Sequence, residues 1–486
     1  MATVTVVGAG VGGLAAAARL AAAGHRVTVF EQAATVGGKL GRHERETAAG
    51  TFRFDTGPSL FTLPQVAAEL FASTGGGGLD LVPLDPIVRH RFPDGSTLDS
   101  TGGDAFAERI AATFGADAAA DWRRLWRRAG RVWAASWRHV LTSPVDGPLR
   151  MAGLAWRLGD LAAIAPGRTL RGLGRTHLRD PRLRMLLERY ATYTGADPRR
   201  APAALLAIPY AELAFGGWYL RGGLGTLADA LLARCESLGV RVHTGTAVRS
   251  IAVAGSRAAG VVLDDGAEVA ADVVVANADA LHVYRDLLPS PRVARRLAAR
   301  SLGGFVLLLG VRGRTAGLAH HTVFFPRDYD AEFDAVFGTA SGTGPSPVAD
   351  PAVFVTVADD PLVRPDGYEA WFVLVNAAPQ GPVDWRSAGP GHADRVLEVL
   401  AERGFDVRDR LLFREVLTPA DLEAATRSPG GAIYGTAGHG LAGMLRPPNR
   451  APVPGLFLVG GSVHPGGGLP LVMLSAKIVA DLIGAG

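Results

Sequence analysis

The sequence predicts an α/β fold in which a βαβ domain is interrupted by inserted regions. Residues 4–31 have the pattern of an apolar strand, a glycine turn, an alanine-rich helix and a second strand. Helix and strand patterns return in residues 222–279 and 455–483, where they can complete the same domain. Between the first two segments, residues 102–209 include a helical pattern rich in tryptophan and arginine. We therefore expect one α/β domain assembled from separate segments.

Three glycines follow the first strand at the spacing of a dinucleotide-binding turn. Gly8 permits a tight turn out of the strand, Gly10 lets the backbone approach a pyrophosphate, and Gly13 lets the helix pack closely on the strand. The helix, expected over residues 12–23, would direct the free N–H groups of its N-terminus toward the phosphates. These features predict a dinucleotide site.

An acidic residue ends the second strand. Glu31 lies 18 residues after Gly13, where its carboxylate can accept hydrogen bonds from ribose hydroxyls. Because the chain has 63 glycines, the glycine spacing alone is a weak signal, and the strand, helix and acid around it make it specific. The carboxylate of Glu31 also disfavours the 2′-phosphate of NADP.

Length and composition indicate a globular protein of two domains. At 486 residues the chain is too long for one simple core, and 48% of its residues are hydrophobic and 20% charged. The net charge is only +4, although arginines far outnumber the two lysines, Lys39 and Lys477. No basic run is interleaved with aromatic residues in a recognisable nucleic-acid fold, so no nucleic-acid partner is expected.

The cysteine count and the apolar segments indicate the cellular compartment in which the protein is expected. Cys235 is the single cysteine, which excludes a disulfide framework and a thiolate metal site. The N-terminus lacks the basic region and small-residue cleavage site of a signal peptide. The apolar residues 452–486 are interrupted by Pro465, Pro470 and several glycines, which argues against a membrane-spanning helix. A cytoplasmic protein is expected.

Two further turns follow the βαβ unit. Gly37 and Gly38 can pass a second stretch of backbone against the same ligand, and the cation of Lys39 can face the pyrophosphate. Residues 52–60, with the sequence FRFDTGPSL, predict a strand that runs into a Gly-Pro turn. Taken alone, each segment indicates no more than a loop.

In their order along the chain, these motifs resemble the flavin-dependent carotenoid desaturases, the bacterial phytoene desaturase family within the amine-oxidase-like flavoproteins. Residues 189–195 (RYATYTG) and 217–224 are similar to the middle of this family, especially its hydroxyneurosporene and methoxyneurosporene desaturase branch. Residues 305–310 and 318–321 are similar to a later strand and loop, and residues 455–470 resemble the C-terminal signature. The resemblance covers the whole chain.

The resemblance implies a Rossmann-like FAD-binding domain with an inserted domain that binds substrate and associates with a membrane. It also implies FAD as the resident cofactor, since the glycine turn alone permits FAD or NAD. The electron acceptor would be oxygen or a quinone, and the backbone at Val248 would hold the adenine. The residues expected to bind the cofactor are Gly8, Gly10, Gly13, Glu31, Gly38, Lys39, Gly57, Pro58, Ser59, Val248, Gly461, Pro470 and Leu471.

Domain boundaries are expected where the cofactor motifs stop and resume. Residues 1–101, 210–295 and 426–486 would form the FAD-binding domain. Residues 102–209 would form a helical domain for substrate and membrane, and residues 296–425 a second substrate domain.

One helix of the inserted region carries tryptophans along one face. At 100° per residue, Trp122, Trp126, Trp133 and Trp137 fall within about 60° of one another, with arginines opposite. Such a helix either lies at a membrane surface or packs on its own protein with its arginines in water, because amphipathicity alone does not distinguish the two. A carotene is held in the bilayer, which favours the membrane and predicts peripheral association with the inner face of the cell membrane.

The C-terminal segment is expected to close the site. A strand, a glycine loop at residues 460–468 and a helix begun by Pro470 would direct helical N–H groups at the flavin N1–C2=O edge, which becomes negative on reduction. His464 in the loop is the candidate catalytic residue, able to orient the flavin or take a proton. The alternative is a loop histidine that bonds to backbone.

Other candidate residues are weaker. Tyr434 and His439 lie in a glycine-rich segment, and the adjacent His320 and His321 are not placed to share one metal, so no metal site is expected. No Ser/His/Asp or paired-carboxylate spacing is found. This suits a reaction in which the flavin takes a hydride while the protein binds, orients and excludes water.

Three functions are compatible with the sequence. The first is an FAD-dependent desaturase that introduces C=C bonds into an acyclic hydrophobic polyene, by hydride transfer to flavin N5 and loss of a proton. The second is a flavin-dependent carotenoid cis/trans isomerase without net oxidation. The third is an amine-oxidase-like or porphyrinogen-oxidising flavoenzyme, or a flavin-binding protein without turnover. Amine oxidases often place a lysine near N5, whereas Lys477 is expected on the helix behind the flavin loop.

Overall fold

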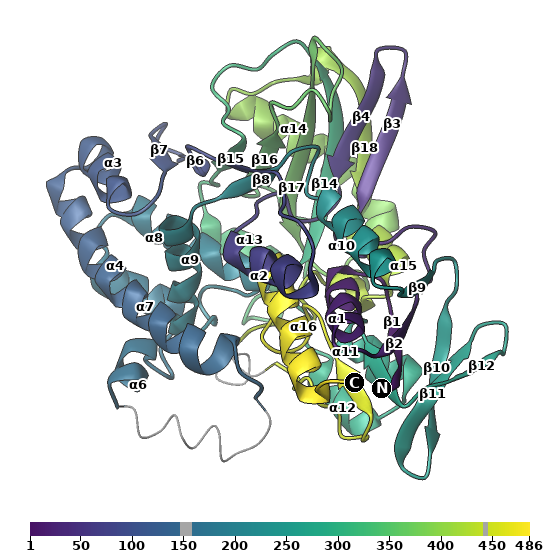
Figure 1. The fold of residues 1–486 in the computed structure, drawn as a ribbon. Helices are drawn as coiled ribbons and strands as arrows, with labels where there is room; N and C mark the ends of the chain where they lie inside the picture. Colours follow the sequence, from purple (N-terminus) through teal and green to yellow (C-terminus); the bar gives the residue numbers. More distant parts are fainter. Residues whose placement is uncertain (146–157, 441–445) are drawn as a thin grey trace.

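A five-stranded parallel sheet contains the predicted βαβ unit, with the first strand of the chain at its centre. In spatial order the strands are β19 (Leu456–Leu458), β13 (Val273–Ala276), β1 (Thr3–Val7), β2 (Arg26–Phe30) and β9 (Arg241–His243). The computed structural model (Figure 1) describes residues 1–145, 158–440 and 446–486. Within residues 222–279, where the sequence predicts helix and strand patterns, β12 (Glu268–Ala270) and β13 are separate strands, and only β13 joins this sheet.

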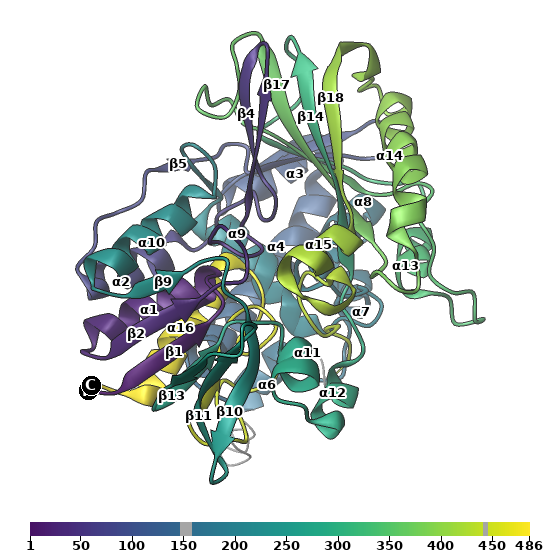
Figure 2. The ribbon, with the colours of Figure 1, turned by 90° about the vertical axis from the view of Figure 1, so that its right-hand side faces the viewer.

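Different elements pack on the two faces of the parallel sheet (Figure 2). Val6, Val29 and Val275 pack against the helices α1 (Val11–Ala22), α2 (Pro64–Thr74), α10 (Thr226–Ser237) and α16 (Leu469–Ile483). Val7 and Phe30 point to the other side. That side is covered by the antiparallel strands β10 (Val248–Ala254), β11 (Arg257–Leu263) and β12 (Glu268–Ala270), and by α11 (Ala280–His282), η4 (Val283–Leu287) and α12 (Pro291–Leu297).

A seven-stranded sheet forms a second lobe. Its strands, in spatial order, are β18 (Leu411–Leu417), β14 (Gly303–Arg312), β17 (Tyr368–Ala377), β16 (Val353–Val357), β15 (His321–Phe324), β6 (Val88–Arg91) and β7 (Thr97–Ser100). Helix α14 (Trp385–Glu402) lies along one face of this sheet (Figure 2). Trp371 and Trp385 are buried in the core between them. The other short elements of this lobe are α13 (Tyr329–Phe337), η5 (Arg408–Arg410), α15 (Pro419–Thr426) and η6 (Pro429–Gly431).

Residues of the first expected segment, 1–101, contribute to both lobes. The strands β6 and β7 join the seven-stranded sheet, and Phe52 and Phe54 pack with Phe372 on β17. The two remaining strand pairs are β3 (Arg42–Thr47) with β4 (Gly50–Asp55), and β5 (Leu81–Pro83) with β8 (Trp218–Leu220). Because such pairing joins segments distant in sequence, local patterns did not reveal it, and the five-segment division remains a prediction.

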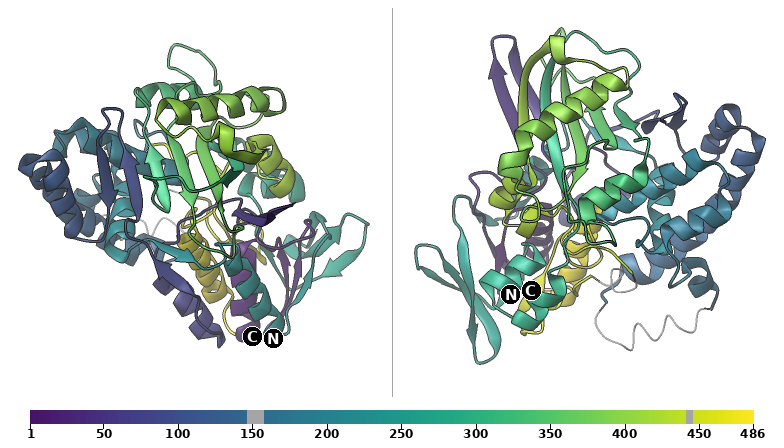
Figure 3. Two further views of the ribbon diagram at one scale, coloured as in Figure 1. Left: turned by 90° about the horizontal axis from the view of Figure 1, so that it is seen from above. Right: turned by 180° about the vertical axis from the view of Figure 1, so that it is seen from behind.

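A layer of helices lies to one side of both sheets (Figures 1 and 3). It comprises α3 (Ala105–Phe114), α4 (Ala116–Ser136), η1 (Trp137–Leu141), α6 (Leu158–Ile164), α7 (Leu170–His177), α8 (Pro181–Arg189), η2 (Tyr190–Thr194), η3 (Ala203–Leu206) and α9 (Ala207–Phe215). These elements lie in the helical region expected over residues 102–209, except that α9 continues to Phe215. Residues 146–157 of that region lie outside the described residues.

The tryptophan face of α4 packs on the protein itself. Trp122 is 3% exposed, and the ring centroid of Trp126 lies 4.6 Å from that of Tyr210. Trp133 lies 5.4 Å from Phe215. The arginines of the opposite face at positions 123, 127 and 131 are exposed. Of the two interpretations of this amphipathic helix, the contacts support the one in which the tryptophans are internal.

The two ends of the chain lie side by side (Figure 3), and the backbone N–H of Gly486 donates to the carbonyl of Ala23. The C-terminal helix begins at Leu469, slightly earlier than predicted, and keeps Pro470 in its first turn. Among the described residues, no helix is both long enough and apolar enough to cross a bilayer.

Candidate active site

The glycine turn lies at the carboxyl edge of the parallel sheet, between β1 and α1. Gly8 has a φ of +95°, and a Cβ there would lie 2.5 Å from the carbonyl oxygen of Asn277. At Gly13 a Cβ would lie 2.1 Å from the carbonyl oxygen of Gly8. At Gly10 it would lie 2.7 Å from Oδ1 of Asn277. Gly8 and Gly13 thus allow the tight turn and close packing that the sequence predicts, and Gly10 lies against Asn277, whose role the sequence did not define.

The other two turns lie against this one. The N–H of Gly37 donates to a carbonyl of the glycine turn, and a Cβ at Gly38 would lie 3.2 Å from Cα of Gly10. A Cβ at Gly57 would lie 1.9 Å from the carbonyl oxygen of Lys39. Three segments that the sequence singled out separately therefore meet at one place. Of the residues that follow in the third turn, Pro58 is exposed and Ser59 is buried.

Glu31 and Val248 lie together beside the glycine turn. The buried carboxylate of Glu31 accepts hydrogen bonds from the N–H groups of Ala9 at 2.7 Å and Ala33 at 2.9 Å. Its backbone carbonyl accepts the N–H of Thr246 at 2.7 Å, two residues before Val248 begins β10. This geometry suits a ribose at Glu31 and an adenine at the backbone of Val248.

The ammonium group of Lys39 is directed away from the glycine turn. Its Nζ donates to Oγ of Ser428 at 3.1 Å and to the carbonyls of Ala432 and Ile433 at 2.8 Å each. A lysine has three N–H donors, so all are used. Burial lowers the pKa of Lys39 to about 8. The prediction that this cation faces the pyrophosphate is therefore not supported by its contacts.

Lys39 belongs to a buried group that we call the Lys39 cluster: Lys39, Asp279, Arg300, Ser428 and Arg446. Asp279 receives hydrogen bonds from Arg300 at 2.7 Å and from Ser428 at 3.1 Å. Burial raises the pKa of Asp279, but Arg300 and Lys39 outweigh it and lower the pKa overall. Arg446 donates to three backbone carbonyls, and burial lowers its pKa to about 10. Three cations thus surround one carboxylate.

The Lys39 cluster lies beside the C-terminal glycine loop. A Cβ at Gly435 would lie 2.6 Å from Cβ of Ser462, and one at Gly467 would lie 2.4 Å from the ring of Tyr434. A Cβ at Gly461 would lie 3.4 Å from Cα of Gly467. The loop leads into α16, whose first turn has no acidic residue and no side-chain cap from Gly468. The N–H groups near Pro470 and Leu471 therefore have no side-chain cap, as an anion-facing helix end requires.

His464 is tied to the helical layer. Its Nε2 lies 2.9 Å from the carbonyl oxygen of Ser143, and the residue is 4% exposed. Burial lowers its pKa, so the ring is neutral near pH 7. These contacts match the alternative of a loop histidine bonded to backbone rather than an acid or base. The weaker candidate His439 is also engaged, because its Nε2 accepts the N–H of Asp197 at 2.9 Å.

His320 and His321, at the start of β15, do not form a metal site with other described residues. His321 has its two ring nitrogens 3.3 Å and 3.2 Å from the carbonyl oxygens of Ile87 and Ser59. Burial lowers the pKa of His320 to about 4. Across the described part of the chain, no group of three or more His, Cys, Asp or Glu residues is placed to hold a metal ion.

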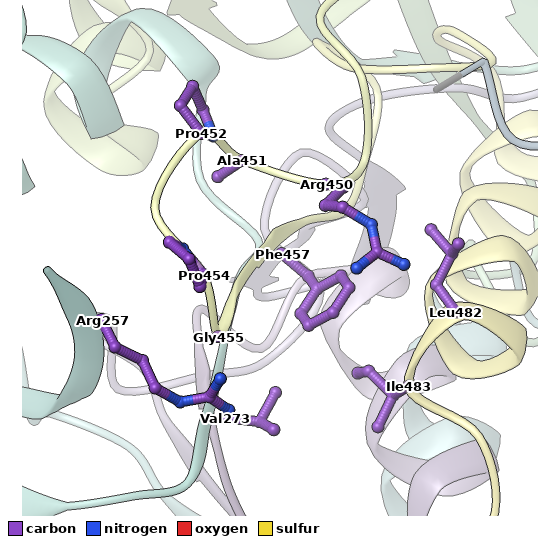
Figure 4. A pocket seen from close by; sticks show the side chains of 10 residues that line it. All are labelled: Arg257, Val273, Arg450, Ala451, Pro452, Pro454, Gly455, Phe457, Leu482 and Ile483. Atoms are coloured by element: carbon purple, nitrogen blue, oxygen red, sulfur yellow. The ribbon is translucent and has the colours of Figure 1, made fainter. Parts of the chain in front are cut away.

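A cavity of about 360 Å³ lies at the opposite edge of the parallel sheet (Figure 4). Gly455 and Val273, which line it, stand where β19 and β13 begin. Ligands of open α/β sheets bind at the carboxyl ends of the strands, so this cavity is separate from the cofactor site. Its other prominent side chains are Arg257, Arg450, Phe457, Leu482 and Ile483.

The model of the flavin-containing amine oxidoreductase family matches residues 11–309. The chain belongs to this family. Membership confirms the predicted oxidoreductase class and the predicted FAD cofactor. Three features of the site fit FAD: the glycine turn after β1, the buried carboxylate of Glu31 and the uncapped N-terminus of α16. We propose that they hold the pyrophosphate, the ribose and the flavin edge, respectively. Bound there, FAD supplies a hydride acceptor.

Relatives in this family match the chain over its whole length. The hydroxyneurosporene desaturase of Rhodobacter capsulatus is 35% identical and covers 99% of this chain and 98% of its own. The 1-hydroxycarotenoid 3,4-desaturase of a Flavobacterium species is 31% identical over 98% of each chain. The 4,4'-diapolycopene oxygenase of a Methylomonas species is 31% identical over 99% of this chain and 97% of its own. The predicted resemblance to the carotenoid desaturases is thus confirmed.

Solved structures confirm the fold. An oxidoreductase from Methanosarcina mazei superposes with a TM-score of 0.67 at 16% identity, covering 99% of this chain and all of its own. A triple mutant of putrescine oxidase with redesigned cofactor binding gives a TM-score of 0.65 at 16% identity, over 99% and 98% of the two chains. At such identities the likeness concerns the architecture alone, which is the predicted α/β class.

Proposed function

We propose that this flavoenzyme is an FAD-dependent desaturase of an acyclic, hydroxylated carotenoid. The observation that carries the proposal is the full-length similarity to hydroxyneurosporene desaturases, at 35% identity. The same chain has the glycine turn that suits the pyrophosphate of FAD. In the reaction, two hydrogens leave adjacent carbons, one as a hydride to the flavin and the other as a proton. The protein binds and orients the polyene and excludes water.

The alternatives have less support. An amine oxidase often places a lysine near N5, but Lys39 donates all its hydrogen bonds to residues 428–433, and Lys477 is paired with Asp481 at 2.7 Å on the exposed side of α16. A carotenoid isomerase would use the same fold without net oxidation. The product spectrum separates it from a desaturase, because desaturation lengthens the chromophore.

The test is expression of the gene in one bacterium that accumulates phytoene and in another that accumulates hydroxylated neurosporene. We expect the second pigment to lose two hydrogens per new double bond and to absorb further to the red. An unchanged pigment in both hosts, from protein that carries FAD, would contradict the proposal. A gain of oxygen instead would indicate the reaction named for the Methylomonas relative.

We further propose that the protein associates peripherally with the inner face of the cell membrane and passes electrons to oxygen or a quinone. A carotenoid is held in the bilayer, which supports membrane delivery. The exposed arginines at positions 123, 127 and 131 of α4 offer a cationic face for anionic headgroups. Sedimentation with anionic vesicles, but not with zwitterionic ones, is expected and should weaken when these arginines become glutamine. Equal sedimentation of wild type and variant would remove α4 from the proposal.

A further inference from the structure

A second group of buried polar side chains lies between the helical layer and the seven-stranded sheet. We call it the Arg189 cluster, and its members are His90, Arg189, Tyr190, Tyr193, Glu212 and Tyr329. The rings of His90 and Tyr329 pack on the same side chain, Phe325, at centroid distances of 6.1 Å and 5.8 Å. The members of the cluster come from β6, α8, η2, α9 and α13, so that one site collects residues separated by more than two hundred positions. The cofactor motifs do not include any of them.

One half of the Arg189 cluster is bonded internally. The hydroxyls of Tyr190 and Tyr193 donate to the two carboxylate oxygens of Glu212 at 2.8 Å and 2.9 Å. Glu212 is 1% exposed, and burial raises its pKa although the charge of Arg189 opposes this. The guanidinium carbon of Arg189 lies 5.2 Å from the ring centroid of Tyr193 and 5.6 Å from that of Phe354. Glu212 and the two rings thus hold the arginine in place.

The other half is left without partners. Within the described residues, Nη1 of Arg189, the hydroxyl of Tyr329 and both ring nitrogens of His90 are buried and make no hydrogen bond. Arg189 is 7% exposed, Tyr329 5% and His90 0%. Burial lowers the pKa of His90 well below its ordinary value, so its ring is neutral. Buried polar atoms are nearly always paired, so a cluster of such exceptions indicates a ligand that completes the set.

The Arg189 cluster lies close to both loops that we assign to the flavin. The guanidinium carbon of Arg189 lies 5.6 Å from the ring centroid of Phe354, which stacks at 5.4 Å on His321, and Nε2 of His321 lies 3.2 Å from the carbonyl oxygen of Ser59 in the Gly-Pro turn. A Cβ at Gly195, which ends η2, would lie 2.9 Å from the ring of Tyr434, and that ring packs against Gly467 of the C-terminal loop. Arg189 therefore stands where a substrate in front of the flavin would end.

We propose that Arg189, positioned by Tyr193 and Glu212, donates a hydrogen bond to the terminal hydroxyl oxygen of the carotenoid substrate. A guanidinium has only donors, so it recognises an oxygen lone pair that a hydrocarbon end cannot supply. The neutral ring of His90 and the phenol of Tyr329 provide acceptors for the hydroxyl proton. This assignment rests on the proposed desaturase function and adds the group that selects a hydroxylated polyene.

The position of the cluster agrees with the chemistry named for a relative. In a 1-hydroxycarotenoid 3,4-desaturase, the oxidised bond begins two carbons from the one that bears the hydroxyl. A group that binds the hydroxyl must then lie beside the flavin and not at the far end of a long channel. Arg189, linked to Ser59 through the rings of Phe354 and His321, meets that requirement.

The test compares two substrates on the purified, FAD-loaded enzyme: an acyclic carotene with a terminal hydroxyl and the same carotene without it. We expect the wild type to prefer the hydroxylated carotene in kcat/KM by about 100-fold or more. Arg189→Met should lower this ratio by about 10- to 100-fold, and Tyr329→Phe by a few-fold. Arg184→Met on the same helix, whose side chain donates to the carbonyl of Leu178, is the control and should keep the ratio.

The outcomes separate this inference from the proposed function. A ratio that stays unchanged in Arg189→Met and Tyr329→Phe, with FAD bound, would overturn the inference, as would a wild type that converts both carotenes equally. A wild type that converts neither would overturn the desaturase proposal itself. If Arg189→Met fails to fold, Tyr329→Phe decides, because it removes only a hydroxyl that has no partner among the described residues.

Discussion

The Lys39 cluster and the Arg189 cluster are both buried and charged, but they differ in how far their hydrogen bonds are satisfied. Every donor of Lys39 has an acceptor, and within the described residues no buried polar side-chain atom of its cluster lacks a partner. In the Arg189 cluster, four buried nitrogen or oxygen atoms lack one. A satisfied buried network fixes a structure, whereas an unsatisfied one is retained where a ligand completes it.

The difference assigns the two clusters to different tasks. The Lys39 cluster fastens residues 428–436 to the second glycine turn and to the C-terminal loop, so it holds the flavin site in shape before any ligand arrives. Its excess of cations also suits a site for an anionic cofactor. The Arg189 cluster joins the helical layer to the seven-stranded sheet, and Nη1 of Arg189, unpaired among the described residues, is the donor that we assign to the substrate.

The largest effect is expected at the glycine turn that the Lys39 cluster supports. Gly10→Val should leave the protein without FAD, because its Cβ would lie 2.7 Å from Oδ1 of Asn277 and would occupy the approach of the pyrophosphate. Flavin absorbance of the purified protein measures this. Gly10→Val combined with Asn277→Ala removes the clash within the protein and should still lack FAD. Recovery of FAD in the double variant would show that Asn277 alone explains the glycine.

Removal of the Asp279 carboxylate from the Lys39 cluster should have the next largest effect. Asp279→Asn leaves Lys39, Arg300 and Arg446 without their counter-charge, and breaking a buried ion pair costs about 3–5 kcal/mol. Urea unfolding should therefore shift strongly, and FAD content should fall. The exposed Asp265, changed to asparagine, is the matched control and should unfold like the wild type. Equal stability of Asp279→Asn and wild type would refute a structural role for the cluster.

A pair of hydroxyl deletions compares the clusters directly. Ser428→Ala leaves an N–H of Lys39 unpaired and removes one of the two side-chain hydrogen bonds to Oδ2 of Asp279, and it should cost about 1–3 kcal/mol. Tyr329→Phe removes a hydroxyl that has no partner among the described residues, so substrate-free protein should be as stable as wild type or slightly more stable. Thermal unfolding of both variants checks this, and similar losses in both would erase the distinction between the clusters.

The buried lysine should give stability an alkaline dependence. The pKa of Lys39 falls from 10.5 to about 8 on folding. Between these values the unfolded chain holds a proton that the folded protein lacks, so the unfolding free energy should rise by about 1.4 kcal/mol per pH unit. Lys39→Met should lack this rise. Urea unfolding of wild type and variant at about pH 7.5 and pH 9.5 measures this change of the unfolding free energy with pH. The same change in both proteins would contradict the lowered pKa of Lys39.

The smallest effect is expected at His464. His464→Gln loses a hydrogen bond to the carbonyl of Ser143, worth about 1 kcal/mol, and turnover should change by only a few-fold. A catalytic acid or base would contribute about 100- to 10,000-fold. A loss of that size, with FAD still bound, would restore His464 as a catalytic residue.

Local patterns predicted the glycine turn, the strand before Glu31 and the C-terminal loop with its helix, because each depends on neighbouring residues and on backbone geometry. The hydrogen-bond acceptors of Lys39 were not predicted, because one of them, the carbonyl of Ile433, lies 394 positions away in the sequence. Helical periodicity predicted that the tryptophans share one face of α4. It could not predict that Tyr210 and Phe215 pack against that face.

The substrate side was the least predictable. Residues 189–195 were noted as a motif without a role, since Arg189 gains its meaning only from Glu212, His90 and Tyr329 on other elements. Similarly, the strand β6 was expected in the cofactor domain, and its pairing with β15 placed His90 in the second lobe.

The most direct measurement is anaerobic addition of a hydroxylated acyclic carotene to the FAD-loaded enzyme, with the flavin absorbance and the pigment recorded together. We expect the oxidised flavin band to bleach as the carotenoid loses two hydrogens and shifts to the red, in equal molar amounts. Bleaching by an amine but not by the carotene, or a carotenoid change without bleaching, would contradict the assignment of this chain as a carotenoid desaturase.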